Sequence, residues 1–444
     1  MPEIQPILDN LVPSLLAKWS VPGVAVGVSF RGERALLGYG VTNVDHPLEV
    51  DATTIFQIGS ISKTLLGVVI SRLVSAGLLD LDWPVASLLS NDAVDQRITT
   101  RHLITHTSGI DGQNMIGDAP QILAGTAVDS IAASLRHFLD QPLRFAPGTD
   151  YSYSGPGFML AAAVVEAVTG RPYVDTLQEL ALDPASMGLT FTLADQVVTH
   201  RVAAPHTTEG SAARVLRDEG WQRHWQLPAW DVPGGGVLSN ARDLMRYGEY
   251  LMSEDAPVGV FDIHGHQGAL GKSSGLAWTL SRVGSHVMAS HDGLTVGYAT
   301  NMTVVPSFHL SYCVLSNSVG GRPVVKAIEA AIQDALLGTH DRPNLDRRHP
   351  AELKDFAGTF DFGFYGMVRV GLVDDGLSMS PIPESSSYAF VLDPPTAELM
   401  VPSAADQLMI LEPERHRGSL IGVIRDPAGR VVALNNGRIA FRVN

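Results

Sequence analysis

The 444-residue chain contains one cysteine and no long uninterrupted apolar run. Cys313 alone cannot form an intrachain disulfide, and its alternating apolar surroundings predict a small buried side chain. The longest small apolar run, from Met159 to Val168, is interrupted by Glu166 and is too short to span a bilayer. The N-terminus lacks the basic and apolar regions of a signal peptide, so we expect a soluble, cytoplasmic protein.

Charge is also scarce, since only 17% of the residues are charged whereas 45% are hydrophobic. This balance indicates a globular protein. The net charge of −15 argues against nucleic acid and anionic membrane surfaces as partners. A chain of this length exceeds what one core usually organises, so we expect two domains.

Lysine is the rarest basic residue, and Lys63 is the one lysine that follows a serine by three positions, in Ser60-Ile61-Ser62-Lys63. Residues i and i+3 share a helix face, so the hydroxyl and the amine can meet. A serine becomes a nucleophile when a nearby base takes its proton, and a desolvated lysine can do so. Ser60 follows a glycine at the start of a helical pattern. It is therefore either a nucleophile at a helix N-terminus or an ordinary N-cap.

The order of the expected elements predicts an α+β fold. A β-hairpin over 24–41 is followed by a mostly helical region from 60 to about 250. Strands near 285–291, 297–305 and 308–316 and a helix at 323–337 come next. We expect an antiparallel sheet that unites the hairpin with the late strands, and a first domain over 1–340. A polar linker over 341–352 and a small all-β barrel or sandwich over 353–444 complete the chain.

Two further segments supply groups that an acyl-transfer site needs. Tyr153 follows a Pro-Gly turn and precedes a helix, where it serves either as an acid/base or as packing. His291 ends a strand ahead of Gly293, and it either lines a site or plays a structural part. Each is ambiguous alone.

Together with Ser60–Lys63, these segments resemble the penicillin-recognising serine hydrolases: class C β-lactamases, D,D-peptidases, D-aminopeptidases and β-lactamase-like esterases. The family-like motifs occur in the family's order across residues 5–337. They are S-x-x-K at 60–63, Leu-Ile-Thr-His-Thr-Ser-Gly at 103–109, Phe-x-Pro-Gly-Thr at 145–149 leading to Tyr153, Pro-Gly-Gly-Gly-Val-Leu-Ser at 233–239 and H-x-G at 291–293.

The resemblance implies roles for these residues. Ser60 would form the acyl-enzyme, and Lys63 and Tyr153 would move the proton to the leaving group. His291 would occupy the third-motif position. The backbone N–H groups of Ser60 and Val296 would form the oxyanion hole.

Substrate contacts are expected from Gly155, Gly293 and Trp230. The tryptophans at 221, 225 and 230 either wall an apolar pocket or pin a long loop. We assign no cofactor and no metal: Asp262, His264 and His266 alternate, but no further ligand pattern supports a metal site.

Two departures from the family pattern shape the expected function. Tyr153-Ser154-Gly155 replaces the usual Y-x-N, and His291-Asp292-Gly293 replaces K-T-G. Both argue against a dedicated β-lactamase and favour hydrolysis of a small amide, peptide or ester, as in a D-aminopeptidase, amidase or esterase. The alternatives are an acyltransferase or peptide cyclase with an amine or alcohol acceptor, and a non-catalytic binding module.

The segment after the linker, Phe356 to Phe360, resembles the start of a lipocalin-like barrel found in some family members. Such a barrel either narrows the site or mediates homo-oligomers. Arg438 and Arg442 near the C-terminus either reach a substrate or lie in solvent.

Overall fold

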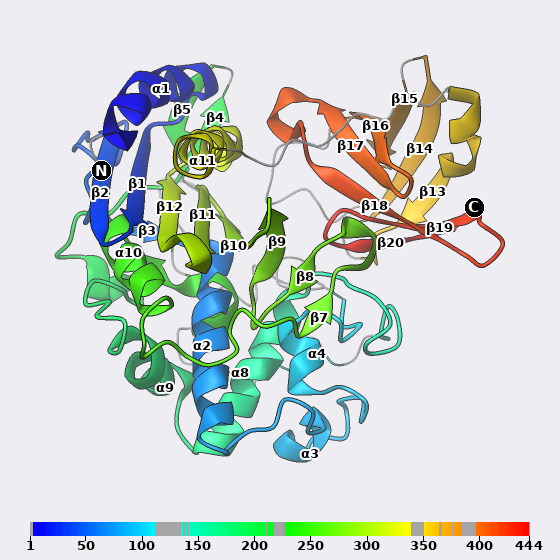
Figure 1. Ribbon diagram of the computed structural model, residues 1–444, viewed down its shortest axis with the longest axis horizontal. Helices are drawn as coiled ribbons and strands as arrows, with labels where there is room; N and C mark the ends of the chain where they lie inside the picture. Colours follow the sequence, from blue (N-terminus) through cyan, green and yellow to red (C-terminus); the bar gives the residue numbers. More distant parts are fainter. Residues whose placement is uncertain are drawn as a thin grey trace.

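The computed structural model describes residues 3–111, 142–209, 211–216, 227–338, 350–363, 366–374, 376–382 and 397–443, with Ile131, Leu135, Leu139 and Trp225. In chain order they form an α+β domain and then a closed barrel (Figure 1). The predicted fold class is confirmed. Most of the predicted linker, 341–349, lies outside the described residues.

A two-residue turn closes the N-terminal hairpin. β1 (Gly23–Phe30) pairs with β2 (Glu33–Gly40), and the register ends at Phe30 opposite Glu33. Arg31 and Gly32 both have positive φ, 52° and 87°. Two positive φ values are typical of the turn whose twist matches that of paired antiparallel strands.

The hairpin joins the late strands in one antiparallel sheet, as the sequence predicts. Among the described residues the order is β2-β1-β12-β11-β10-β9-β8-β7. β1 pairs along its length with β12, which brings residues about 290 positions apart into contact. The late strands are β7 (Gly265–His266), β8 (Ser273–Ser274), β9 (Thr279–Val283), β10 (His286–Thr295), β11 (Tyr298–Val305) and β12 (Leu310–Ser316).

Side chains that alternate along the central strands fill two separate cores. On one face, Val24, Val26 and Val28 pack with the N-terminal helix α1 (Ile4–Trp19) and the late helix α11 (Arg322–Leu337). On the other face, Ala25 and alternate residues of β11 and β12 pack with the helical region. Figure 1 shows α1 and α11 beside each other on one side of the sheet.

The helical region places the predicted motifs at helix ends. α2 begins two residues after Ser60, and α8 begins two residues after Tyr153. The segment from Tyr173 is α-helical to Leu177 and continues as a π-helical turn, Gln178–Leu182. The described helices here are α2 (Ser62–Ser75), α3 (Val85–Leu89), α4 (Thr100–Ile104), α8 (Gly155–Thr169), α9 (Tyr173–Leu177) and α10 (Ala241–Tyr250). Two short strand pairs, β3 (Phe56–Gln57) with β6 (Leu238–Ser239) and β4 (His206–Glu209) with β5 (Ala212–Val215), lie outside the main sheet.

The C-terminal unit is a closed antiparallel barrel of eight described strands. Its core is apolar and separate from the cores of the first domain. The strands are β13 (Gly358–Asp361), β14 (Met367–Val373), β15 (Gly376–Pro381), β16 (Glu398–Ala404), β17 (Gln407–Glu412), β18 (Leu420–Arg425), β19 (Val431–Asn435) and β20 (Ile439–Arg442). The lipocalin-like character expected of it stays a prediction.

The barrel packs on the segment that leads to Tyr153. Arg144 donates to the backbone carbonyl of Asp361 at 2.6 Å and pairs with its carboxylate at 3.2 Å. Phe145 shares a small apolar cluster with Ala433 and Ile439. β18 contacts the 3₁₀ turn Gly268–Leu270, which lies between β7 and β8 at the edge of the large sheet (Figure 1). No helix in the described part of the chain has the length and apolarity to cross a membrane.

Candidate active site

Ser60 and Lys63 meet at the start of α2. Ser60 lies in the 3₁₀ turn Gly59–Ile61, and the Lys63 Nζ lies 3.2 Å from its Oγ. Gly59 has a φ of +55°, and a Cβ there would stand 2.8 Å from the backbone nitrogen of Leu294. The turn therefore needs glycine both for its backbone conformation and for its close approach to β10.

The amine of Lys63 is buried and has few partners. Lys63 is 3% exposed, and its Nζ donates to the carbonyl oxygen of Gly234. The rings of Tyr153 and Phe158 lie 5.0 and 5.4 Å from Nζ. A buried amine needs such partners, because water is not there to solvate it. One carbonyl, one hydroxyl and two aromatic rings thus hold Lys63 beside Ser60.

Tyr153 stands over this amine, held by His106. The two rings stack with centroids 4.2 Å apart, and the His106 Nδ1 accepts from the backbone N–H of Ser154 at 3.0 Å. Burial, and secondly the charge of Lys63, holds the pKa of His106 well below its usual range, so this ring is neutral. The Tyr153 hydroxyl is buried and has no hydrogen-bond partner among the described residues. A buried phenol without a partner is available to a substrate.

His291 faces Tyr153 from β10, with ring centroids 6.2 Å apart. Its Nδ1–H donates to the carbonyl of Asp292 at 2.7 Å, which leaves Nε2 as an acceptor. Burial, helped by the charge of Lys63, lowers the pKa of His291 to about 4. The imidazole is therefore neutral at neutral pH.

From His291 onward, the edge of β10 is no longer paired with β9, and this part of the strand lies beside the turn that carries Ser60. β9 pairs with β10 only as far as Ser290. Beyond that point Gly293 packs so closely on the turn that a Cβ would fall inside contact distance of the Ile58 carbonyl. The backbone nitrogen of Leu294 faces Gly59, whereas Val296 lies in the turn after β10 ends at Thr295. The structure thus brings Leu294 toward Ser60, and the predicted donor Val296 lies two residues farther along.

The sequence reasoning missed one ionisable group. Asp231 is 6% exposed and lies just before the π-helical turn Val232–Gly236. Its carboxylate folds under this turn, so that a Cβ on Gly234 would stand 2.6 Å from Oδ1. Burial raises the pKa of Asp231 to about 7, although the charge of Lys63 opposes the rise. This carboxyl group titrates near neutrality beside the residue that binds Lys63.

The whole first domain matches a family of known proteins, Beta-lactamase, over residues 8–337. The chain belongs to this family. Penicillin-binding protein 4 of Amycolatopsis lactamdurans is 26% identical over 332 residues, which cover 68% of this chain and 83% of that protein. Other relatives are named as β-lactamases and as an esterase. Family relatives are serine hydrolases that include esterases, amidases and peptidases.

Two solved structures resemble the chain along its full length, barrel included. The crystal structure of SurE has a TM-score of 0.73 at 22% identity and covers 99% of both chains. The octameric penicillin-binding protein homologue from Pyrococcus abyssi has a TM-score of 0.64 at 21% identity and covers 98% of this chain and 99% of that one. At these identities the likeness shows the fold.

Other predicted site residues of this β-lactamase-family chain fall near the serine or in the core. Gly155 is the first residue of α8, whose N-cap is Ser154. Trp230 is buried in the main core next to Asp231, and the Trp225 Nε1 donates to the Tyr298 hydroxyl at 2.7 Å. Both tryptophans pack with the main core, and the choice between a pocket wall and a loop anchor stays a prediction. Trp221 lies outside the described residues.

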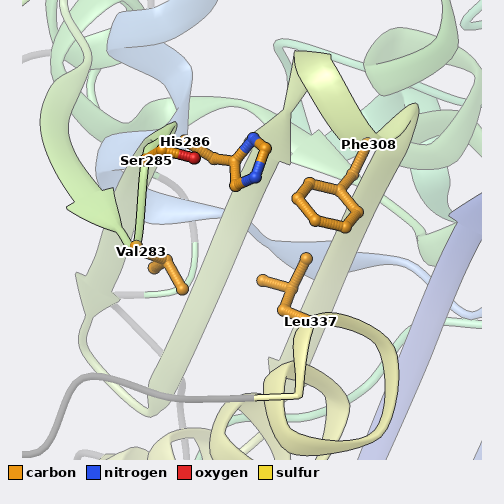
Figure 2. Close-up of a pocket in the computed structure, with 6 residues that line it drawn as sticks. Val283, Ser285, His286, Phe308 and Leu337 are labelled. Carbon is orange, nitrogen blue, oxygen red and sulfur yellow. The ribbon is translucent and has the colours of Figure 1, made fainter.

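Three remaining features lie apart from the serine. His264 contacts Arg101 and the Gly259 carbonyl, and no group of three or more metal-ligating side chains occurs in the described ranges. Arg442 stays in the barrel, where it donates to the carbonyls of Asp355 and Val431. A pocket of about 240 Å³ lies at one end of the sheet (Figure 2). Its lining residues, which do not include Ser60, Lys63, Tyr153 or His291, are Val283, Gly284, Ser285, His286, Phe308 and Leu337.

Proposed function

We propose that this β-lactamase-family protein hydrolyses a small amide, peptide or ester through an acyl-enzyme on Ser60. One arrangement carries the proposal: the buried Lys63 Nζ lies 3.2 Å from the Ser60 Oγ and 5.0 Å from the ring of Tyr153, whose buried hydroxyl has no partner among the described residues. A nucleophile, a base and a second proton carrier are the groups that acyl transfer requires. A binding module would have no need of all three.

In the proposed mechanism the Ser60 Oγ attacks the substrate carbonyl as Lys63 takes the hydroxyl proton. Tyr153 then carries a proton to the leaving amine or alkoxide, and the bond between carbonyl and leaving group breaks. Water then attacks the acyl-enzyme as Tyr153 takes its proton, and a proton returns through Lys63 to the Ser60 Oγ as the acyl group leaves. The N–H groups of Ser60 and Leu294 would stabilise the oxyanion; the backbone nitrogen of Leu294 lies against Gly59, the residue before the serine.

The surrounding groups support a substrate other than a β-lactam. His291 is neutral and offers no permanent cation to a ring carboxylate. Ser154 and Gly155 have no side-chain amide to offer a substrate. The Ser154 hydroxyl also serves as the helix cap, where it accepts a hydrogen bond from the N–H of Gly157. Among the structural neighbours are a D-stereospecific amidohydrolase and SurE with D-Leu. These names support an amide substrate with a D-residue, and the octameric neighbour supports a homo-oligomeric assembly.

A second candidate, transfer of the acyl group to an amine, draws on one further contact. The Arg438 guanidinium of the barrel lies 5.1 Å from the Tyr153 ring. A fixed cation beside the group that would activate the acceptor favours an acceptor that carries a carboxylate, such as an amino acid. Water would then compete with this acceptor for the same acyl-enzyme.

The test is covalent labelling with a fluorophosphonate, read by intact mass. We expect a single adduct on the wild type, no adduct on Ser60→Ala and a rate at least 100-fold lower on Lys63→Ala. Ser75→Ala, an exposed serine on the same helix, is the matched control and should label normally. An adduct that persists in Ser60→Ala contradicts the mechanism. Product analysis with D- or L-amino acids added to an ester substrate separates hydrolysis from transfer.

A further inference from the structure

The turn between β19 and β20 of the barrel binds directly to the segment that carries Tyr153. The backbone N–H of Tyr153 donates to the carbonyl of Gly437 at 2.8 Å. The Ser152 hydroxyl accepts from the N–H of Ile439 at 3.3 Å. A domain some 280 residues farther along the chain therefore fixes the backbone at Tyr153.

Asn435 ties the two segments together. It is 2% exposed, and its side-chain Nδ2 donates to the carbonyl of Tyr151 at 2.7 Å. Its Oδ1 accepts from the backbone N–H of Gly437 at 2.9 Å, which holds the turn in shape. Gly437 has a φ of +107°, a conformation that suits glycine. One buried amide thus orders the turn and attaches it to the tyrosine segment.

The same turn leaves its neighbouring asparagine in solvent. Asn436 is exposed, and its Oδ1 accepts only a 3.3 Å bond from the N–H of Arg438 within the turn. The two adjacent asparagines differ in burial and in contact with the tyrosine segment. They form a natural pair for comparison.

Few other contacts set the position of the Tyr153 phenol. Its hydroxyl has no partner among the described residues, so its ring is placed by its contacts with His106, Lys63, His291 and Arg438 and by the backbone from which it extends. A reacting group that shifts by about 1 Å can lose about 100-fold in rate. The backbone hydrogen bond from Tyr153 to Gly437 therefore helps to set the position of the Tyr153 hydroxyl.

We propose that Asn435 is a positioning residue for Tyr153, and that the contacts of Asn435, Gly437 and Ile439 with the tyrosine segment are a structural part of the active centre. This inference rests on the proposed function, in which Tyr153 carries the proton. It assigns the C-terminal barrel a role inside the catalytic unit of its own chain.

The experiment compares Asn435→Ala with Asn436→Ala by the second-order rate of fluorophosphonate labelling. We expect Asn435→Ala to slow labelling about tenfold or more and Asn436→Ala to stay within about twofold of the wild type. Circular dichroism and a thermal melt check that both variants are folded. Asn435→Asp retains the acceptor for Gly437 but loses the donor to Tyr151, so it should also be slow.

A double-mutant cycle separates positioning from general loosening. In a Tyr153→Phe background the phenol is gone, so Asn435→Ala should slow the residual labelling by less than about twofold. The proposal is overturned if the folded Asn435→Ala labels at the wild-type rate, or if it slows labelling equally in both backgrounds. Failure of the proposed function has a different signature, since the wild type itself would then carry no adduct on Ser60.

Discussion

Asp231 gives the most quantitative prediction, because its buried carboxyl group should make the protein less stable as pH rises. Burial raises its pKa from an ordinary 3.8 to about 7. The native state therefore holds a proton on Asp231 over a pH range in which the unfolded chain has lost it. Stability falls with rising pH wherever the native state binds more protons than the unfolded state.

The magnitude follows from the width of that range. Each pKa unit corresponds to about 1.36 kcal/mol, so the two units between pH 5 and pH 7 amount to about 3 kcal/mol. Above pH 7 both states are ionised and the loss levels off. The substitution Asp231→Asn keeps the shape of the side chain and removes the ionisation. Relative to the wild type, this variant should gain about 3 kcal/mol of unfolding free energy between pH 5 and pH 8.

Urea unfolding of wild type and Asp231→Asn at pH 5, 6, 7 and 8 measures this difference. The wild type must be compared with the variant at each pH because His291 changes the stability of the protein with pH in the opposite direction. Its pKa is lowered to about 4, so its contribution to stability is lost as pH falls below about 6.5. Asp262→Asn, which removes one negative charge at an exposed aspartate, is the matched control. Parallel pH curves for wild type and Asp231→Asn would refute the assignment of a buried, near-neutral carboxyl group.

Two further predictions concern β10. Gly293→Ala should lower kcat/KM about 100-fold, because its Cβ would collide with the Ile58 carbonyl and push β10 away from the serine turn. Gly371→Ala is the control, since a Cβ at that position meets open space. Equal activities of the two variants would contradict the close packing at Gly293. The His291 imidazole should show no NMR titration between pH 5.5 and 8, since its pKa is about 4; a midpoint near 6.5 would show that the ring is solvated.

The chemistry-bearing elements of this chain were predictable because they rest on local patterns. The spacing of Ser60 and Lys63 predicts a contact that any helical turn produces, and the structure has it at 3.2 Å. The hairpin and the late strands follow from alternation, and their union in one sheet follows from the order of elements. The family match over residues 8–337 agrees with the motifs found by inspection.

What the sequence hid depends on tertiary packing. Nothing in the spacing of Asp231 separates it from the other 45 acidic residues, because its burial arises only when the glycine turn folds over it. Asn435 contacts Tyr151 across 284 positions and lies in a different domain. Which backbone nitrogen lies against the serine turn depends on strand register: Leu294 of β10 lies against Gly59, and the predicted donor Val296 follows the end of the strand.

The departure from Y-x-N now has a local explanation in the geometry around Lys63. An amide at position 155 would be one way to orient the lysine, but the Lys63 Nζ already has the Gly234 carbonyl and the Ser60 hydroxyl as partners. Position 155 is also the first residue of α8, directly after the Ser154 cap. The absence of an amide at position 155 therefore leaves Lys63 held by its other partners, and the donor that is missing is one that would have contacted the substrate. Under the proposed function, we therefore expect substrate selection to depend on groups on other elements, namely His291 on β10 and Arg438 on the barrel turn.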